Sequence, residues 1–304
     1  MSDAPTLPTM TIGDVRAMLA ANPADPDAPL VAADMRASMA QTTTAFPPHP
    51  GVEMTDDTLG GVRARRFTPA NAVPGRTLLY FHGGGYVIGS PESHQGLTSN
   101  IAHAMGATAY SMDYRMGPEN PFPAAIEDGV AAYRGLLDAG VPPNQVIISG
   151  DSAGGGTSVA TTLKAREQGL PMPAGLALLS PWVNLANTGW SYTARADADP
   201  MINQRNIDWF ADTYLAGQDP AHPLASPING NLSGLPPMLI QVGPDECLLS
   251  DAVTLAERAG AAQVDVTLEI WPGMIHVFQM FAPMLPEAQR AVDRIGAWAA
   301  DRTA

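Results

Sequence analysis

Short apolar runs alternate with longer amphipathic stretches along most of the chain from Val52 onward. The short runs are apolar either continuously or at every second position, which is typical of β-strands. Turn-forming glycine, proline and aspartate residues separate them. We expect eight strands, of which the first two form a hairpin: Val52–Thr58, Val62–Thr68, Thr77–His82, Thr108–Met112, Gln145–Ser149, Gly175–Ser180, Met238–Val242 and Val264–Ile270.

The stretches between most of these strands have apolar residues three or four positions apart, which predicts helices. We expect helices at Gln95–Met105, Ala124–Ala139, Ala153–Gln168, Leu248–Ala262 and Glu287–Ala300. Short apolar strands separated by amphipathic helices are typical of a parallel sheet covered on both faces. The sequence therefore predicts an α/β fold with a mostly parallel, eight-stranded sheet.

Two segments depart from this alternation. Residues 1–50 are rich in Ala, Pro and Met and contain two amphipathic stretches, Ile12–Ala21 and Leu30–Met39. Residues 186–234 belong to a connection of about fifty residues between two strands, and a connection of that length usually has a function or a structure of its own. We expect both segments to form a helical cap over the carboxyl edge of the sheet, where ligands bind in open α/β sheets. The alternative for residues 186–234 is a simple surface insertion.

Composition and charge narrow the class of protein. The 304 residues are 45% hydrophobic and 15% charged, which suits a globular enzyme with a full core rather than a disordered chain. The net charge of −14 argues against a nucleic-acid partner, because phosphate groups would be repelled. Cys247 is the only cysteine, so an intramolecular disulfide and a cysteine metal cluster are excluded. No signal-peptide pattern opens the sequence and no apolar run approaches about 18 residues, so we expect a cytoplasmic protein with no membrane partner.

The segment Gly150-Asp-Ser-Ala-Gly154 lies between an apolar strand and a helix, which is the context that a G-x-S-x-G nucleophile motif requires. The serine of such a motif occupies a strained turn, and the two glycines avoid collisions with the neighbouring chain. Ser152 would then be exposed at the tip of the sheet. Small residues also cluster at many other turns between strands and helices, so Ser152 needs a base and an acid to become a nucleophile.

The candidate base is one of the only two histidines that follow Ser152. His222 lies within residues 186–234 and suits a turn or a surface position. His276 follows the last predicted strand in a loop that returns to the carboxyl edge, so we expect it to be the base. A core histidine bonded to backbone groups is the alternative on the sequence alone.

The candidate acid should follow the strand Met238–Val242. Asp245 lies just past the end of that strand and is the expected partner of His276, although an aspartate at such a turn is often a helix N-cap. Glu246 is expected to point elsewhere. Asp251 falls inside the following helix and is the second candidate.

A run of three glycines, Gly83–Gly85, follows the strand Thr77–His82, where an oxyanion loop of the HGGG type is expected. Bare backbone can approach a substrate closely, so the N–H groups of Gly83 and Gly84 can point to the same position as that of Ala153. Such a run is otherwise more often a flexible turn. His82 is expected to be structural and to hold the loop by a hydrogen bond.

Four motifs stand out along the chain: His82-Gly-Gly-Gly-Tyr86, Asp113-Tyr-Arg-Met-Gly-Pro-Glu119, Phe122-Pro-Ala-Ala125 and Gly150-Asp-Ser-Ala-Gly-Gly155. Through them the chain resembles the hormone-sensitive-lipase-type esterases, the bacterial family IV carboxylesterases of the α/β-hydrolase fold. The resemblance runs from about Val52 to the C-terminus. It implies hydrolysis of short-chain acyl esters through an acyl-enzyme, without a cofactor or a metal. It also implies a catalytic domain made of residues 51–185 and 235–304, with a cap from residues 1–50 and 186–234.

The resemblance also implies roles for individual residues. It places the catalytic triad on Ser152, Asp245 and His276, and the oxyanion donors on Gly83, Gly84 and Ala153. Asp151 would support the nucleophile. The family's usual Asp-Pro-Leu-Arg-Asp is here Asp245-Glu-Cys-Leu-Leu-Ser-Asp251, and its usual His-Gly-Phe is here His276-Val-Phe278. Similar proteins are commonly dimers, so a homodimer is a further expectation.

The expected partners are a small-molecule ester and water, with short- to medium-chain acyl groups favoured. The same machinery opens lactones, which is the main alternative. An amidase would need a stronger acid for the departing amine, and a non-catalytic receptor of this fold would lack the base. Apolar residues are more often core than substrate contacts, but eight of them could line the acyl and alcohol sites: Tyr86, Val87, Trp182, Met201, Trp209, Phe210, Tyr214 and Ile275.

Overall fold

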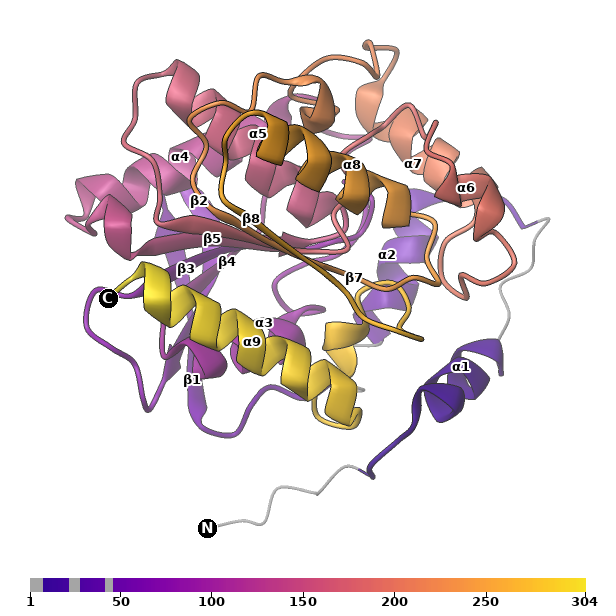
Figure 1. Ribbon diagram of the computed structural model, residues 1–304, viewed down its shortest axis with the longest axis horizontal. Helices are drawn as coiled ribbons and strands as arrows, with labels where there is room; N and C mark the ends of the chain where they lie inside the picture. The colour runs from indigo at the N-terminus through magenta and orange to yellow at the C-terminus, as the bar shows by residue number, and fades with distance from the viewer. Residues whose placement is uncertain (1–7, 22–27, 42–45) are drawn as a thin grey trace.

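The structure of the protein is a computed structural model that describes residues 8–21, 28–41 and 46–304 (Figure 1). An eight-stranded sheet with the order β1-β2-β4-β3-β5-β6-β7-β8 forms its centre. β2 runs antiparallel to both of its neighbours, β1 and β4, and all other neighbouring strands are parallel. The predicted fold class is therefore confirmed. The strands are β1 (Val52–Leu59), β2 (Val62–Pro69), β3 (Thr77–Phe81), β4 (Thr108–Met112), β5 (Val146–Asp151), β6 (Gly175–Leu179), β7 (Met238–Val242) and β8 (Val266–Ile270).

Helices cover both faces of the sheet. In Figure 1, α4, α5 and α8 lie on one face, and α3 and α9 lie on the other. Among the described residues, short 3-10 helices lie in the connections: η2 (Pro143–Gln145), η3 (Pro227–Asn229) and η4 (Phe278–Phe281). The helices of the two layers are α3 (Gln95–Met105), α4 (Ala124–Asp138), α5 (Ala153–Glu167), α8 (Leu249–Ala261) and α9 (Pro286–Arg302).

The central strands are apolar throughout because both of their faces are buried. Successive side chains of a strand point to opposite faces. In β3, Leu79 and Phe81 belong to the core under α4, α5 and α8, whereas Leu78 and Tyr80 belong to the core under α3 and α9. The continuous apolar run that predicted this strand thus reflects two cores rather than one.

The predicted bounds agree with the structure to within about two residues. The last strand starts at Val266 and not at Val264, because the N–H group of Val264 donates to Ala259 O at 3.0 Å and so completes the turn that ends α8. Gln145 lies in η2, so β5 begins at Val146, one residue later than predicted. Within the described residues, no helix is both long and apolar enough to span a lipid bilayer.

The segments expected to form a cap lie beyond one end of the sheet. They contain α1 (Ile12–Ala20) and α2 (Ala32–Gln41) near the N-terminus, and α6 (Ser191–Ala194) and α7 (Gln204–Leu215) in the long connection. In Figure 1, α2, α6 and α7 gather near the end of β7. Residues 1–7, 22–27 and 42–45 of the predicted N-terminal unit lie outside the described residues.

Arg36 holds helix α2 against the carboxyl edge of the sheet. Its guanidinium donates to Val87 O and to Gly117 O, both at 2.7 Å, and forms an ion pair with Glu119. Val87 follows the glycine run after β3, so the contact holds α2 against the loop that leaves the sheet at this point. A segment remote in sequence is thereby placed beside Ser152.

Candidate active site

Ser152 occupies a strained turn between β5 and α5. Its φ is 54° and its ψ is −120°, a conformation that residues with side chains rarely adopt. The neighbouring glycines are sterically required, because a Cβ atom on Gly150 would lie 2.4 Å from Gly154 C and one on Gly154 would lie 1.9 Å from Phe81 O. The N–H group of Ser152 donates to Leu179 O at 2.9 Å. The backbone is thus fixed while the side chain lines a cavity.

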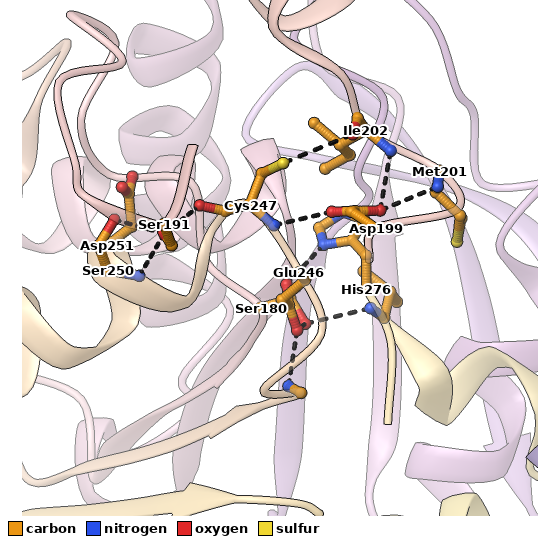
Figure 2. A network of polar contacts seen from close by, with 12 residues as sticks. Ser180, Ser191, Asp199, Met201, Ile202, Glu246, Cys247, Ser250, Asp251 and His276 are labelled. Carbon is orange, nitrogen blue, oxygen red and sulfur yellow. Dashed lines mark hydrogen bonds and ion pairs between the residues drawn. The ribbon is translucent and has the colours of Figure 1, made fainter. Parts of the chain in front are cut away.

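His276 faces the same cavity from the loop after β8 and is paired with Glu246. Its Nδ1 atom lies 2.9 Å from Glu246 Oε2 (Figure 2). The other carboxylate oxygen, Oε1, accepts hydrogen bonds from Gly243 N–H at 2.6 Å and from the Ser180 hydroxyl at 2.9 Å. The hydroxyl oxygen of Ser180 also accepts from Val277 N–H at 3.1 Å, so one serine joins the turns that carry the two partners.

The prediction that Asp245 is the partner of His276 is wrong in this structure. Asp245 is about one-third exposed and forms an ion pair with Arg16 of α1 at 2.6 Å. The turn after β7 directs Asp245 outward and Glu246 inward, because the carboxylate of Glu246 bonds to the backbone of its own turn. Sequence reasoning rejected Glu246, although it lies in the same turn after β7, only one residue farther from the strand end than Asp245.

The second candidate acid, Asp251, is also occupied elsewhere. Its Oδ2 atom accepts from the N–H groups of Val183 and Asn184, both at 3.0 Å, and its Oδ1 atom accepts from the Tyr192 hydroxyl at 3.1 Å. These contacts join the start of α8 to the connection that leads into α6. Burial raises the pKa of Asp251 to about 7, although the three hydrogen bonds oppose the shift.

The electrostatic environment of His276 favours its charged form. Burial alone would lower the pKa of His276, but the hydrogen bond and the charge of Glu246 outweigh burial and raise the pKa above its usual value of 6.5. The carboxylates of Asp199 and Asp151 add to the rise. An imidazole that accepts a proton from Ser152 is therefore stabilised as the imidazolium.

The glycine run after β3 differs from its predicted use in one residue. Gly83 N–H donates to Asp151 Oδ1 at 3.0 Å, so this group is not available to a substrate and the prediction of Gly83 as an oxyanion donor is wrong. Gly84 and Gly85 line the cavity instead. Within the part of the chain that the structure describes, the N–H groups of Gly84, Gly85 and Ala153 have no acceptor. Gly85 was not foreseen as a donor.

The imidazole ring of His82 contacts the backbone of this glycine run. Its Nδ1 atom lies 2.8 Å from Gly83 O, and its ring stacks on Tyr114 with centroids 4.5 Å apart. Burial, reinforced by the nearby His94, lowers the pKa of His82 to about 3, so its ring is neutral at ordinary pH. The backbone carbonyl of His82 accepts from the Tyr114 hydroxyl at 2.7 Å.

Asp151 fixes the same loop from the side of Ser152. Its Oδ1 atom accepts from the Tyr80 hydroxyl at 2.6 Å in addition to Gly83 N–H, and its Oδ2 atom lies 3.5 Å from His94 Nε2. Burial raises the pKa of Asp151, but the charge of His94 and the hydrogen bonds outweigh it and lower the pKa overall. His94 lines the cavity and was not singled out from the sequence, which offers no signal for it.

The cavity above Ser152 has a volume of about 240 Å³. Of the eight predicted pocket residues, Trp182, Met201 and Phe210 line it. The other five do not: Tyr86 stacks on Tyr214 with centroids 4.1 Å apart, Val87 and Ile275 are core residues, and Trp209 packs against Phe210. Further lining residues were missed by sequence reasoning: Met35, Met39, Phe46, Ile88, Ser93, Leu97, Ile202, Asn206, Ile207, Val277 and Met280.

The missed residues come largely from segments far from Ser152 in the sequence. Met35 and Met39 are four positions apart in α2, a spacing that places both on one helix face and that could have indicated them. Asn206 and Ile207 come from α7, and Met280 comes from η4. Among the described residues, no group of three or more histidine, cysteine, aspartate or glutamate side chains could hold a metal ion.

Comparison with known proteins places these features in a family context. Residues 78–280 match the model of a family described as alpha/beta hydrolase fold. An acetyl-hydrolase of Streptomyces hygroscopicus is 48% identical over 79% of this chain and 80% of its own length. An esterase of Acinetobacter venetianus is 34% identical over 87% of this chain and 88% of its own length.

Solved structures are similar over almost the whole chain. A hormone-sensitive lipase from a metagenome library is 46% identical, covers 98% of this chain and 100% of its own, and superposes with a TM-score of 0.94. The esterase EstE5, in a crystal soaked with p-nitrophenyl butyrate, is 44% identical, covers 96% of this chain and 98% of its own, and superposes with a TM-score of 0.93. Both agree with this chain in fold and in length.

Proposed function

The chain belongs to the alpha/beta hydrolase fold family and is a carboxylesterase of the hormone-sensitive-lipase type. We therefore propose that Ser152, His276 and Glu246 form its catalytic triad. The observation that carries the proposal is the 2.9 Å contact between His276 Nδ1 and Glu246 Oε2 beside a cavity that Ser152 also lines. Because Glu246 holds the Nδ1–H tautomer, the Nε2 atom of His276 is left free to accept a proton.

The reaction then proceeds in two acyl-transfer steps. Ser152 Oγ attacks the ester carbonyl carbon while His276 Nε2 accepts the hydroxyl proton, and Glu246 stabilises the imidazolium that forms. The tetrahedral intermediate collapses, the C–O bond to the alcohol breaks, and His276 returns the proton to the departing oxygen. Water repeats the sequence on the acyl-serine and releases the carboxylic acid.

The negative charge that develops on the carbonyl oxygen is stabilised by backbone N–H groups. We infer that the donors are Gly84, Gly85 and Ala153, because Gly83 N–H already donates to Asp151. Removal of one such donor typically costs about 3–4 kcal/mol of transition-state stabilisation. Asp151 and His82 support the loop without contacting the substrate in this scheme.

The cavity favours uncharged acyl esters. Its lining is mostly apolar, and among the lining residues that the structure describes there is no lysine or arginine. We infer short- to medium-chain acyl esters as substrates, which is consistent with the soaking of the similar esterase EstE5 with p-nitrophenyl butyrate. Lactone hydrolysis stays an alternative that the same assay covers.

The segments 1–50 and 186–234 are proposed to form the cap of this site. Met35 and Met39 of α2 line the cavity, and so do Met201 and Phe210 of the segment 186–234. The cytoplasmic location, the homodimer and the absence of nucleic-acid or membrane partners stay predictions from the sequence.

The test of the proposal is hydrolysis of p-nitrophenyl butyrate by the purified full-length chain and by Ser152→Ala. The wild type should release p-nitrophenolate, and the variant should release none above background while its circular dichroism spectrum and melting temperature stay close to those of the wild type. Esterase activity in Ser152→Ala close to that of the wild type would overturn the assignment.

A further inference from the structure

The buried carboxylate of Asp199 bonds the turn that carries Glu246 to the cap. Asp199 lies between α6 and α7, within residues 186–234, and only 9% of its surface is exposed. The mechanism proposed above assigns it no part. Its side chain nevertheless lies between the wall of the substrate cavity and the residue that follows Glu246 (Figure 2).

One oxygen of Asp199 bonds to the wall of the cavity, and the other bonds to the turn that carries Glu246. Oδ1 accepts hydrogen bonds from Met201 N–H at 2.8 Å and from Ile202 N–H at 2.9 Å, and both of these residues line the cavity. Oδ2 accepts from Cys247 N–H at 2.8 Å, across 48 residues of sequence. The Sγ atom of Cys247 in turn lies 3.5 Å from Ile202 O, as a weak donor to it.

The first two contacts would suffice to shape the local turn of the cap. The third contact is not needed for that turn, because Cys247 belongs to the other side of the site and directly follows the residue bonded to His276. Ser191 of α6 makes a second bridge to the same region, since its hydroxyl donates to Cys247 O and accepts from Ser250 N–H at 2.9 Å. Both the N–H and the C=O groups of Cys247 are therefore held by the cap.

A carboxylate at position 199 satisfies all three N–H donors. Its oxygens accept and donate nothing, and hydrogen bonds to a charged acceptor are roughly twice as strong as neutral ones. An amide at this position has one accepting oxygen and one NH2 group. In either orientation of that amide, the NH2 group faces a backbone N–H donor, so one side of the bridge is lost.

We propose that Asp199 is a positioning residue that couples the substrate-facing wall of the cap, at Met201 and Ile202, to the turn that holds the catalytic acid Glu246. The inference rests on the proposed function, since it takes Glu246 as the acid. Esters whose acyl or alcohol groups press against Met201 and Ile202 act on the Glu246–His276 pair through Asp199. A change at Asp199 should therefore alter both the chain-length selectivity and the turnover rate.

The experiment compares Asp199→Asn with the matched control Asp197→Asn in the full-length chain. Asp197 is exposed, lies two residues away and changes the net charge by the same amount. For Asp199→Asn we expect kcat on p-nitrophenyl butyrate to fall at least about tenfold, the effect of one lost hydrogen bond to a charged group. We also expect the ratio of kcat/KM for hexanoate to that for acetate to change at least about threefold, whereas Asp197→Asn should leave both quantities unchanged.

A pH profile separates positioning from general loosening of the fold. The charged groups that face His276 are Glu246, Asp199 and Asp151, and loss of the negative charge of Asp199 should move the acidic limb of kcat/KM to lower pH. Asp199→Glu keeps the charge but displaces the carboxylate. It should keep the limb at its wild-type position and still show the lower kcat and the altered selectivity.

The outcomes distinguish this inference from the proposed function. Wild-type kcat, selectivity and pH limb in Asp199→Asn would overturn the coupling while leaving the triad intact. If Asp199→Asn does not fold, Asp199→Glu decides, and wild-type kcat and selectivity in that variant would overturn the coupling as well. Full activity of Glu246→Gln would instead overturn the proposed triad, whatever Asp199 does.

Discussion

His276 Nδ1 and Glu246 Oε2 lie 2.9 Å apart, and both side chains are almost fully removed from solvent. The second oxygen of Glu246 is held by Gly243 and Ser180, so the carboxylate cannot turn away from the imidazole without breaking two further hydrogen bonds. Asp245, the preceding residue in the sequence, is about one-third exposed and forms an ion pair with Arg16. Glu246 and Asp245 thus have different partners, so substituting each of them separately tests which carboxylate supports His276.

Glu246→Gln is expected to lower kcat by about 10³–10⁴-fold. A glutamine NH2 group facing His276 Nδ1 favours the tautomer that carries its proton on Nε2, which cannot accept the proton of Ser152, and a loss of this size follows in other triads. Initial rates of p-nitrophenyl butyrate hydrolysis measure the effect.

Asp245→Asn is the matched control, with the same chemical change one residue away. It breaks an ion pair that is partly exposed to solvent, and such pairs contribute only about 0–1 kcal/mol. Its kcat should stay within about threefold of the wild type. A large loss in Asp245→Asn with near-normal rates in Glu246→Gln would reverse the assignment of the acid.

The activity should fall as the pH is lowered through the pKa of His276. The base must be neutral to accept a proton, and Glu246 raises this pKa above 6.5 despite the opposing effect of burial. The midpoint of the acidic limb of kcat/KM therefore lies above pH 6.5 in the wild type, and below that of the wild type in Glu246→Gln, where burial dominates. A profile that stays flat from pH 8 down to pH 5 is incompatible with a histidine base.

Gly85→Ala tests the corrected set of oxyanion donors. Gly85 has a φ of +60°, and a Cβ atom on it would lie 2.4 Å from the ring of Phe210, so the loop or the ring must shift. We expect kcat/KM to fall at least about tenfold, because a misdirected N–H group no longer stabilises the oxyanion. Steady-state kinetics on p-nitrophenyl butyrate measures the loss.

Gly140→Ala controls for backbone strain in that experiment. Gly140 has a φ of +83° in the loop after α4, and a Cβ atom there has nothing within 4 Å. Backbone strain alone should lower the stability of this variant by about 1 kcal/mol, and its kinetics should stay those of the wild type. Equal activities of the two variants would exclude Gly85 from the site.

The length of the acyl chain should select substrates through the size of the cavity. Each additional CH2 group that is buried adds about 0.8 kcal/mol of binding free energy until the chain reaches the wall. In a cavity of about 240 Å³ we expect the highest kcat/KM at C4 to C6 along a series of p-nitrophenyl esters from C2 to C12. A clear preference for C10 or longer esters, in the absence of detergent, would show that the cavity extends beyond the residues named here.

The predicted fold agrees with the structure because the signals for it are local. The apolar run of β5 and the amphipathic stretch of α5 each suffice to predict their element, and the short turn between them fixes the place of Ser152. His276 follows its own strand, β8, by a similarly short loop. Ser152 and His276 therefore lie after the strands from which they were predicted to project, and both line the same cavity.

The residues that sequence reasoning misplaced depend on contacts that are remote in the chain. Glu246 turns inward partly because Ser180, 66 residues away, donates to it. Gly83 is withdrawn from the cavity by Asp151, 68 residues away. The lining by Met35 and Met39 requires α2 to lie over the glycine run, which Arg36 secures. The sequence around Glu246 and Gly83 contains no pattern that indicates these contacts.

The stability of the folded protein should depend on pH through the titration of a buried acid, Asp251. Burial raises its pKa to about 7 in the folded protein, whereas an unfolded chain has the ordinary value of 3.8. The folded state therefore holds the proton more tightly, and its stability falls as the pH rises through this window. Between pH 5 and pH 8 the contribution is at most about 3 kcal/mol.

Asp251→Asn removes this contribution because an amide does not titrate. Its oxygen can still accept from Val183 and Asn184, and its NH2 group can donate to Tyr192. Urea unfolding at pH 5 and pH 8 should therefore show a smaller loss of stability with pH in the variant than in the wild type. The same pH dependence in both proteins would mean that Asp251 is ionised throughout.

The glycines around Ser152 are packed so closely that a side chain in their place would collide with neighbouring atoms. The cover of the cavity is formed instead by side chains on α2 and α7. A Cβ atom on Gly154 or Gly156 would meet backbone oxygens at 1.9 Å and 2.3 Å, so these positions tolerate almost no variation. Met35, Met39 and Phe210 contribute side chains, and not backbone, to the lining. Mutation can therefore explore new esters at the cover while the reacting groups beneath stay unchanged, which makes this scaffold well suited to directed evolution of substrate range.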